Sequence, residues 1–193
     1  MAVNKIEIAL KEALKKAMEI FWLHGYEKTS IEELVKCMGV HRKSIYDTFG
    51  NKYELFIKSL EYYSTTIGEQ LLKRIGKEKT SLEKIKALFN YNHIDIEEVS
   101  NGCLIVNTGV ELSLHDEHIA KIVQYNFIET EKVIYHILKQ GQCSGEFSSE
   151  LDLRVTSQFI NNALIGIRVQ LKTIDNKEKL KSIIDTTLSI LTN

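Results

Sequence analysis

The sequence of 193 residues contains no proline and only ten glycines. Proline inside a helix removes a hydrogen bond and clashes with the turn before it, and glycine weakens a helix by about 1 kcal/mol relative to alanine. Little in this chain therefore interrupts helices, while a hydrophobic content of 44% is sufficient for a core. The composition predicts an all-α fold, and the apolar periodicity divides it into about nine helices.

Cysteine is scarce, and long apolar runs are absent. The three cysteines, Cys37, Cys103 and Cys143, are odd in number and widely spaced, which argues against a disulfide framework and a structural zinc site. No apolar run approaches the roughly 18 residues of a membrane-spanning helix, and glutamates lie among the first lysines, unlike in a signal peptide. We expect a soluble, cytoplasmic protein with no membrane partner.

The chain also lacks a strong charge of either sign. Its formal net charge is −1, so no basic field covers the whole surface and any nucleic-acid contact must be local. Nucleophile motifs of the Gly-x-Ser-x-Gly type and phosphate-binding glycine loops are absent too. The sequence therefore predicts no enzyme, no cofactor and no bound metal.

What the sequence does contain is a set of short helices near its beginning. Apolar residues recur at helical spacing over residues 6–21, and Gly25 follows as a stop. Ser30 and Glu33 have the spacing of a capping box, in which each side chain accepts from the other residue's amide. A second, short helix is therefore predicted to begin after Ser30 and to end at Gly39.

A third short helix is predicted over about residues 42–49, before Gly50 and Asn51 break the chain and a long helix continues to Gly76. Two short helices joined by a glycine-containing turn, placed between longer ones, have the layout of a helix-turn-helix unit. On the third helix Ile45 and Phe49 would face inward, while the remaining side chains are cationic or form hydrogen bonds. Such a division suits a helix that reads DNA, but the solvated face of an ordinary bundle helix has it as well.

The segment also carries a family resemblance. It is similar to the N-terminal domain of the TetR family of bacterial repressors in three stretches: Phe21-x-x-x-Gly25-Tyr26-Glu27-Lys28-Thr29-Ser30-Ile31, Met38-Gly39-Val40, and the continuous run from Ser44 to Leu55. The resemblance implies a DNA-binding head over residues 1–50, a ligand-binding and dimerisation body over residues 51–193, and a homodimer that represses from a palindromic operator until a small-molecule effector releases it. Carried over by position, it implies DNA contacts from Thr29, Ser30, His41, Arg42, Lys43, Ser44, Tyr46, Thr48 and Lys52.

Two positions depart from the family pattern. His41 stands where a serine commonly caps the third helix, and Asp47-Thr48 stands where aromatic or basic residues are frequent. Asp47 would repel a phosphate but could accept from cytosine N4. The operator sequence therefore cannot be borrowed from a relative.

Two helix-opening motifs lie in the body: Thr80-x-x-Glu83 begins a helix near residue 81, and Asp175-x-x-Glu178 begins the last helix. The last two helices are predicted to form an amphipathic hairpin. Two such hairpins can pack as a four-helix bundle across a two-fold axis. The predicted interface residues are Phe159, Ala163, Gly166, Ile167, Ile184 and Leu188. The alternative is that both helices only cover the core of their own chain.

An effector pocket is predicted between the long fourth helix and the helices of residues 81–138. Its candidate lining residues are Tyr63, Phe89, Tyr91, Cys103, Asn107, Glu111, Tyr125 and Phe127. The stretch from Asn101 to Leu112 is similar to the Gly-Cys-Leu segment of a TetR subgroup that includes the N-ethylmaleimide-responsive repressor, which makes Cys103 a candidate sensor of electrophiles. The alternative is that Cys103 is a small, inert core residue.

Two interpretations from other classes stay open at this point. His115 and His118, with Glu111 one turn earlier, could hold a divalent metal, although the spacing provides no third ligand and Asp116 is an ordinary residue for a helix start. A helical scaffold that binds only protein is the other.

Overall fold

The computed structural model describes residues 2–90, 101–173 and 176–192, and within these ranges it contains nine α-helices and no β-strand. The all-α prediction is confirmed. The helices are α1 (Ala2–His24), α2 (Ile31–Met38), α3 (Arg42–Phe49), α4 (Lys52–Ile75), α5 (Ser81–Asn90), α6 (Leu104–Leu112), α7 (Glu117–Cys143), α8 (Leu153–Gln170) and α9 (Lys177–Ser189). None of these helices combines the length and apolar character needed to cross a membrane.

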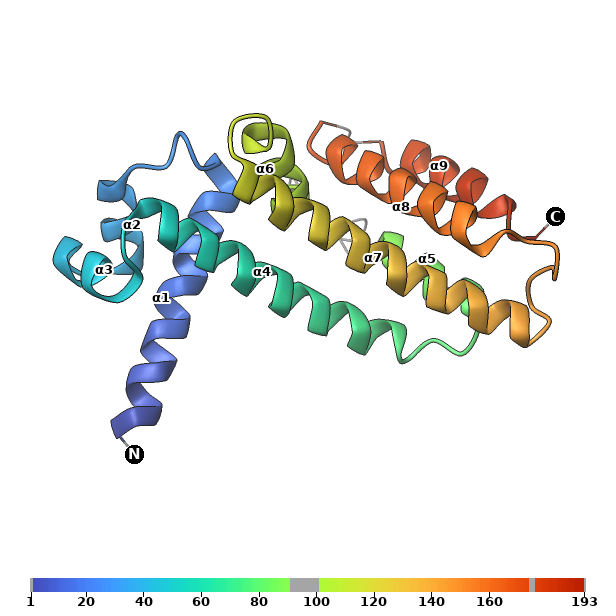
Figure 1. Ribbon diagram of the computed structural model, residues 1–193, viewed down its shortest axis with the longest axis horizontal. Helices are drawn as coiled ribbons and strands as arrows, with labels where there is room; N and C mark the ends of the chain where they lie inside the picture. Colours follow the sequence, from blue (N-terminus) through green and yellow to red (C-terminus); the bar gives the residue numbers. More distant parts are fainter. Residues whose placement is uncertain (1, 91–100, 174–175, 193) are drawn as a thin grey trace.

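The helices form an elongated molecule with α1, α2 and α3 at one end (Figure 1). We call these three helices the head and the remainder the body. Helix α4 runs from the head along the body, and its 24 residues correspond to about 36 Å. Helices α7, α8, α5 and α9 lie in the body, and α6 lies where the head and the body meet (Figure 1).

Two apolar clusters stabilise the molecule. The first joins the head to the body, since it contains Phe21, Leu34 and Ile45 together with Leu104 of α6 and Ile119 of α7. The second lies entirely in the body, between α5, α7, α8 and α9. The core is therefore continuous across residue 50, the predicted limit of the head.

Local capping explains where several helices begin. Thr80 and Glu83 form the predicted capping box, with both amide-to-side-chain distances close to 3 Å. A second complete box, between Asn51 and Glu54 at the start of α4, was not predicted. At Ser30 only half of the predicted box forms: Ser30 Oγ accepts from the Glu33 amide, while the Glu33 carboxylate lies 3.2 Å from His24 Nε2 instead.

The sequence pattern predicts that the long helix beginning near Ile119 closes at Gly141 and that the next helix runs to Ile174, and both limits are wrong. Helix α7 continues through Gly141. The glycine leaves space for the Phe147 ring, since a Cβ atom there would lie 2.3 Å from that ring. Helix α8 ends at Gln170, before Ile174, and α9 is capped by Asn176, whose side chain accepts from the Lys179 amide. The predicted cap residue Asp175 lies outside the described residues.

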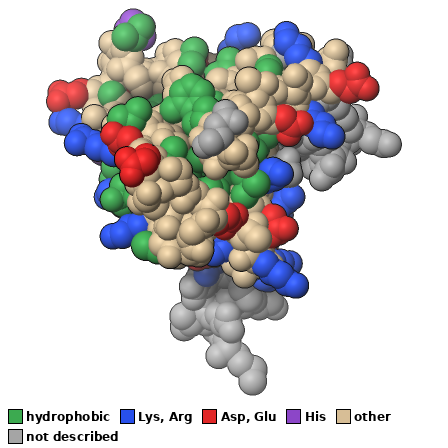
Figure 2. Space-filling model, turned by 90° about the vertical axis from the view of Figure 1, so that its right-hand side faces the viewer, with side chains coloured by type: hydrophobic (Ala, Val, Ile, Leu, Met, Phe, Trp, Pro, Cys, Tyr) green, Lys and Arg blue, Asp and Glu red, His purple; other side chains and the backbone are tan. Residues whose placement is uncertain are grey.

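The surface carries both signs of charge. Figure 2 shows basic and acidic side chains interspersed on the body end of the molecule, in keeping with the net charge of −1. The view shows no large area of one charge.

Candidate DNA-binding surface and ligand cavity

Helices α2 and α3 are joined by a tight turn at Gly39. This glycine has φ +71°, a left-handed conformation that a residue with a side chain rarely adopts. Leu34 of α2 and Ile45 of α3 are fully buried against the rest of the head, and Phe49 is nearly so. Because the apolar sides of both helices face inward, the polar side of α3 faces solvent, as in a helix-turn-helix.

The outer face of α3 is exposed along its whole length. The six predicted contact residues on and beside it, His41, Arg42, Lys43, Ser44, Tyr46 and Thr48, are all exposed. His41 is the N-cap residue, but its side chain makes no capping hydrogen bond. The departure from the serine cap of the family therefore leaves α3 without a side-chain cap.

Arg42 is oriented by two neighbours. Its guanidinium lies 3.1 Å from the Glu32 carboxylate of α2 and 5.9 Å from the centre of the Tyr46 ring. The Tyr46 hydroxyl and then Glu32 raise the pKa of Arg42 above its ordinary value. Since both partners of the Arg42–Glu32 pair are largely exposed, this pair can open when a phosphate or base is offered.

Lys52 is the first residue of α4 and lies at the end of this helix that adjoins the head. Its Nζ is 4.3 Å from the centre of the Tyr26 ring, a cation–π distance. Tyr26 packs in turn on Phe56, with 4.9 Å between ring centres. The aromatic cluster therefore positions Lys52 beside the helix-turn-helix.

The structure does not support a DNA contact by the Thr29 hydroxyl. Thr29 is buried, and its Oγ1 donates a 2.6 Å hydrogen bond to the Gly25 carbonyl. Ser30 is exposed, and its hydroxyl already accepts from the Glu33 amide as the α2 cap. Sequence reasoning could not separate the two, since both residues suit a helix N-terminus.

The side chain of Glu111 was expected to line the effector pocket, but it contacts the head instead. It extends from α6 and accepts hydrogen bonds from two backbone amides of the head, those of Tyr26 at 3.1 Å and Glu27 at 2.9 Å. A second contact at this junction joins the Tyr53 hydroxyl to Asp116. Burial, and then this hydrogen bond, raise the pKa of Tyr53 to about 12.

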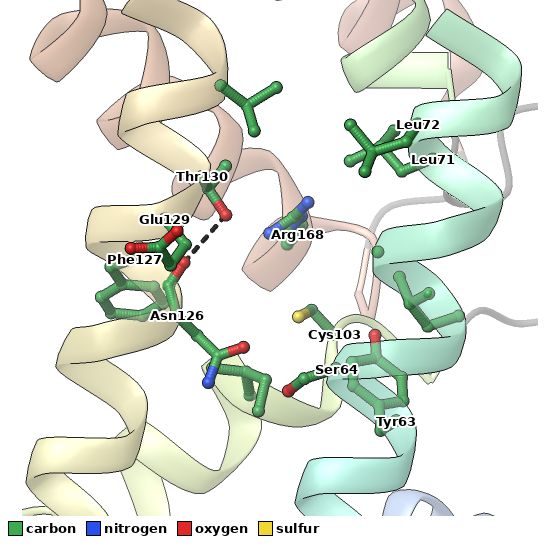
Figure 3. A pocket seen from close by; sticks show the side chains of 14 residues that line it. Tyr63, Ser64, Leu71, Leu72, Cys103, Asn126, Phe127, Glu129, Thr130 and Arg168 are labelled. Atoms are coloured by element: carbon green, nitrogen blue, oxygen red, sulfur yellow. Dashed lines mark hydrogen bonds between the residues drawn. The ribbon is translucent and has the colours of Figure 1, made fainter. Parts of the chain in front are cut away.

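A cavity of about 260 Å³ lies between α4, α7 and α8, with Cys103 at one side (Figure 3), and Ile105 also lines it. Most of its wall is apolar, and polar groups are contributed by Tyr63, Ser64, Asn126, Glu129, Thr130 and Arg168. Gly102 lets its backbone approach α8 closely, since a Cβ atom there would lie 2.9 Å from the Arg168 carbonyl. The cavity lies between α4 and α7, as the predicted pocket does, but α8 also lines it and the described residues of α5 do not.

Three predicted pocket residues, Tyr63, Cys103 and Phe127, line this cavity. The others do not. Asn107 and Glu111 line a separate hollow of about 290 Å³ beside α1, where Asn107 accepts from Lys172 Nζ at 3.2 Å. Phe89 is buried in the body core, Tyr125 is exposed, and Tyr91 lies outside the described residues.

Sequence reasoning missed Arg168. This side chain is only 8% exposed, and its Nε has no hydrogen-bond partner. The signal was present, because Arg168 is a cation within the apolar stripe of α8, four residues after Leu164 and three before Leu171.

The predicted dimer residues divide into two groups. Phe159, Ala163 and Gly166 lie on the outer side of α8, where Val155 and Val169 extend the same apolar stripe. Ile167, Ile184 and Leu188 are buried in the core of their own chain and are unavailable to a partner. For these three residues the alternative, that the hairpin covers its own core, is correct.

The histidine pair does not form a metal site with its neighbours. His115 lies in the turn after α6, both histidines are exposed, and Asp116 caps α7 by accepting from the Ile119 amide. Among the described residues, no group of three or more His, Cys, Asp or Glu side chains is placed to hold a metal ion. The three cysteines are free thiols, with Cys103 buried and Cys143 exposed.

The fold and the exposed face of α3 define the class of helix-turn-helix transcriptional regulators. Two family models match the chain: "Bacterial regulatory proteins, tetR family" over residues 13–58 and "Tetracyclin repressor-like, C-terminal domain" over residues 81–187. The chain belongs to the TetR family of DNA-binding transcriptional regulators.

Curated relatives are similar over almost their whole length. The HTH-type transcriptional repressor ComR of Escherichia coli is 30% identical over 92% of this chain and 86% of its own length. The uncharacterized HTH-type transcriptional regulator YezE of Bacillus subtilis is 27% identical over 92% of this chain and 93% of its own. These relatives are transcriptional regulators and not enzymes, as predicted.

Solved structures share the fold. A TetR regulator from Chloroflexus aurantiacus has a TM-score of 0.87 at 19% identity, covering 98% of this chain and 97% of its own. A cysteine mutant of the TetR family regulator CifR, in complex with 26-base-pair operator DNA, has a TM-score of 0.80 at 22% identity and covers 93% and 94%. The reduced form of E. coli NemR has a TM-score of 0.82 at 18% identity, also covering 93% and 94%.

Proposed function

We propose that this protein is a repressor that binds a palindromic operator as a homodimer and is released by a small-molecule effector held in the body. The observation that carries the proposal is α3, whose inner side is fully buried at Ile45 while every predicted contact residue on its outer side is exposed. Such a protein would act in the cytoplasm, where chromosomal DNA is accessible.

The outer stripe of α8 supports a homodimer. Phe159 is 47% exposed, and a Cβ atom at Gly166 would meet nothing within 4 Å, so another backbone could approach there closely. Two heads related by a two-fold axis would occupy successive major grooves when they are about 34–36 Å apart. A palindromic operator follows from that symmetry.

The path from the cavity to the head supports effector release. Helix α4 lines the cavity with Tyr63 and carries Lys52 at its head end, and α6 lines it with Ile105 and contacts the head through Glu111. An effector that favours a different position of these helices would change the spacing of the two heads. By population shift it would lower operator affinity.

Residues 1–50 would serve as the DNA-binding part and residues 51–193 as the ligand-binding and dimerisation part. Because the first apolar cluster crosses this limit, the two parts would move through shifts at a shared core. A flexible linker is not needed for such coupling.

The test starts from genomic fragments that the purified protein retains, followed by footprinting and by light scattering of the protein with and without DNA. We expect a protected palindrome of two half-sites and a dimeric mass. A monomeric mass on the DNA, or retention without sequence preference, would contradict the proposal.

The matched variant for dimerisation is Gly166→Leu. The Cβ atom it adds meets nothing within 4 Å, so the fold should be retained while the dimer dissociates. Thr65→Leu, at an exposed position of α4, is the control and should stay dimeric. An unaltered dimer in Gly166→Leu would remove α8 from the interface.

A further inference from the structure

Arg168 is a buried cation that forms no ion pair within the described part of the chain. Within the described residues it forms no hydrogen bond or ion pair, although only 8% of it is exposed. A buried charge without a partner is costly and is normally paired or solvated. This side chain lines the cavity, and Figure 3 shows it reaching into the space between α4 and α7.

The one acidic side chain among the described residues that line the cavity already pairs with a lysine. Glu129 also lines the cavity, but its carboxylate lies 2.7 Å from Lys132 Nζ on the same helix. Asn126 and Thr130 are neutral, and the Thr130 hydroxyl donates to the Asn126 carbonyl at 3.0 Å. The charge of Arg168 is therefore available to a ligand.

We propose that the cavity binds a small organic carboxylate, with its carboxyl group on Arg168 and its apolar part along Ile67, Leu71, Ile105 and Val133. Its regulatory meaning rests on the proposed effector release. The volume of about 260 Å³ is below the roughly 300 Å³ at which drug-sized pockets begin, so the ligand is small. An arginine offers paired donors in a plane, which match a carboxylate.

A singly charged anion fits better than a phosphate. Arg168 is the only cation among the described residues that line the cavity, and the Glu129 carboxylate would repel a second negative charge. The Tyr63 hydroxyl can add a donor. Burial, and then the neighbouring Cys103 thiol, raise the pKa of Tyr63 well above its ordinary value, so the phenol stays protonated.

This ligand would connect two helices that lie on different sides of the cavity. Arg168 belongs to α8, which carries the outer apolar stripe, and Tyr63 belongs to α4, which leads to the head. A carboxylate between them would accept hydrogen bonds from both side chains and so favour one spacing of the two helices. Recognition and release would then depend on the same two residues.

The test measures binding of butanoate, hexanoate, octanoate and benzoate to the full-length protein by calorimetry, each beside its neutral amide. We expect at least one carboxylate to bind tenfold or more tightly than its amide. Arg168→Met should remove this preference, and Arg168→Lys should retain part of it. Arg154→Met, at an exposed position of the same helix, is the control and should bind like the wild type.

Arg168→Met removes an unpaired charge at nearly constant volume, so the variant is expected to fold, which circular dichroism checks. Equal binding of amides, an unchanged preference in Arg168→Met, or no binding by any carboxylate would each overturn the proposal. Operator release by the same compounds separates the two proposals. Release by amides alone leaves effector control standing without the anion site, whereas Arg168-dependent binding without release leaves the anion site without effector control.

Discussion

The carboxylate of Glu111 accepts a hydrogen bond from the backbone amide of Tyr26, although 85 residues separate the two in sequence. Its other oxygen accepts from Glu27, so one side chain of α6 holds the turn that follows α1. Glu111 therefore fastens the head to the helix that also contributes Ile105 to the cavity.

Replacing Glu111 by alanine leaves two amides of the head without their acceptor. We expect the free energy of unfolding to fall by about 1–3 kcal/mol, measured by urea denaturation. Glu61→Ala, at an exposed position of α4, is the control and should change stability by less than about 0.5 kcal/mol. Equal stability of the two variants would mean that Glu111 does not fasten the head.

The substitutions Arg42→Ala and Tyr46→Ala test whether the exposed outer face of α3 contacts the operator. Both side chains are exposed, so helicity and dimerisation should be intact while operator affinity falls tenfold or more, measured by gel retention. The exposed cation Lys139 of α7 provides the control, since Lys139→Ala should leave retention unchanged. Retention that survives both head substitutions would sink the assignment of α3.

Thr29→Val distinguishes a structural role from a phosphate contact. The variant keeps the shape but loses the hydrogen bond to the Gly25 carbonyl, and stability should fall by about 1 kcal/mol. Operator affinity at a fixed salt concentration should stay the same, because the buried hydroxyl contacts no DNA, whereas loss of a phosphate contact would weaken binding. Weaker operator binding by a correctly folded Thr29→Val protein would restore Thr29 to the DNA surface.

The lowered pKa of Asp116 predicts that the folded protein loses stability in acid. The Ile119 amide, and then the Tyr53 hydroxyl, lower the pKa of Asp116 below its ordinary value. A lowered folded-state pKa stabilises the fold above the unfolded value of about 3.9, and this contribution is lost as the pH falls through the folded value. Asp116→Asn should therefore be less stable than the wild type at neutral pH and converge with it in acid, as urea titrations at several pH values would show. A constant difference at every pH would contradict this origin.

Cysteine labelling tests the sensor hypothesis for Cys103. This thiol is 4% exposed, whereas Cys143 is exposed, so iodoacetamide should modify Cys143 first and Cys103 only slowly in the native protein. Mass spectrometry of the labelled peptides gives the order. Modification of Cys103 first, or loss of the effector response in Cys103→Ser, would favour electrophile sensing.

Sequence patterns predicted the helices well because periodicity and caps are local. Thr80 and Glu83 can be paired from their spacing alone, and Ile45 from its place on one helix face. Gly141 was misread as a stop because its role depends on the Phe147 ring.

The site was predicted less completely because it depends on distant partners. Glu111 could be placed only once its amide partners in the head were known, and Arg168 only once its Nε was seen to lack a hydrogen-bond partner within the described residues. Periodicity identified Ile167 and Ile184 as facing an interface, but it cannot tell whether a second chain or their own covers them.

If the outer stripe of α8 forms the proposed dimer interface, it links the abundance of the protein to its action. Val155 and Phe159 remain wetted on a lone protomer, so any partner that covers them stabilises the fold by mass action. A cell that makes few copies would then hold protomers that are both easier to unfold and too dilute to occupy two half-sites. The thermal midpoint should rise with protein concentration, and the onset of repression should be a threshold in copy number instead of a proportional response.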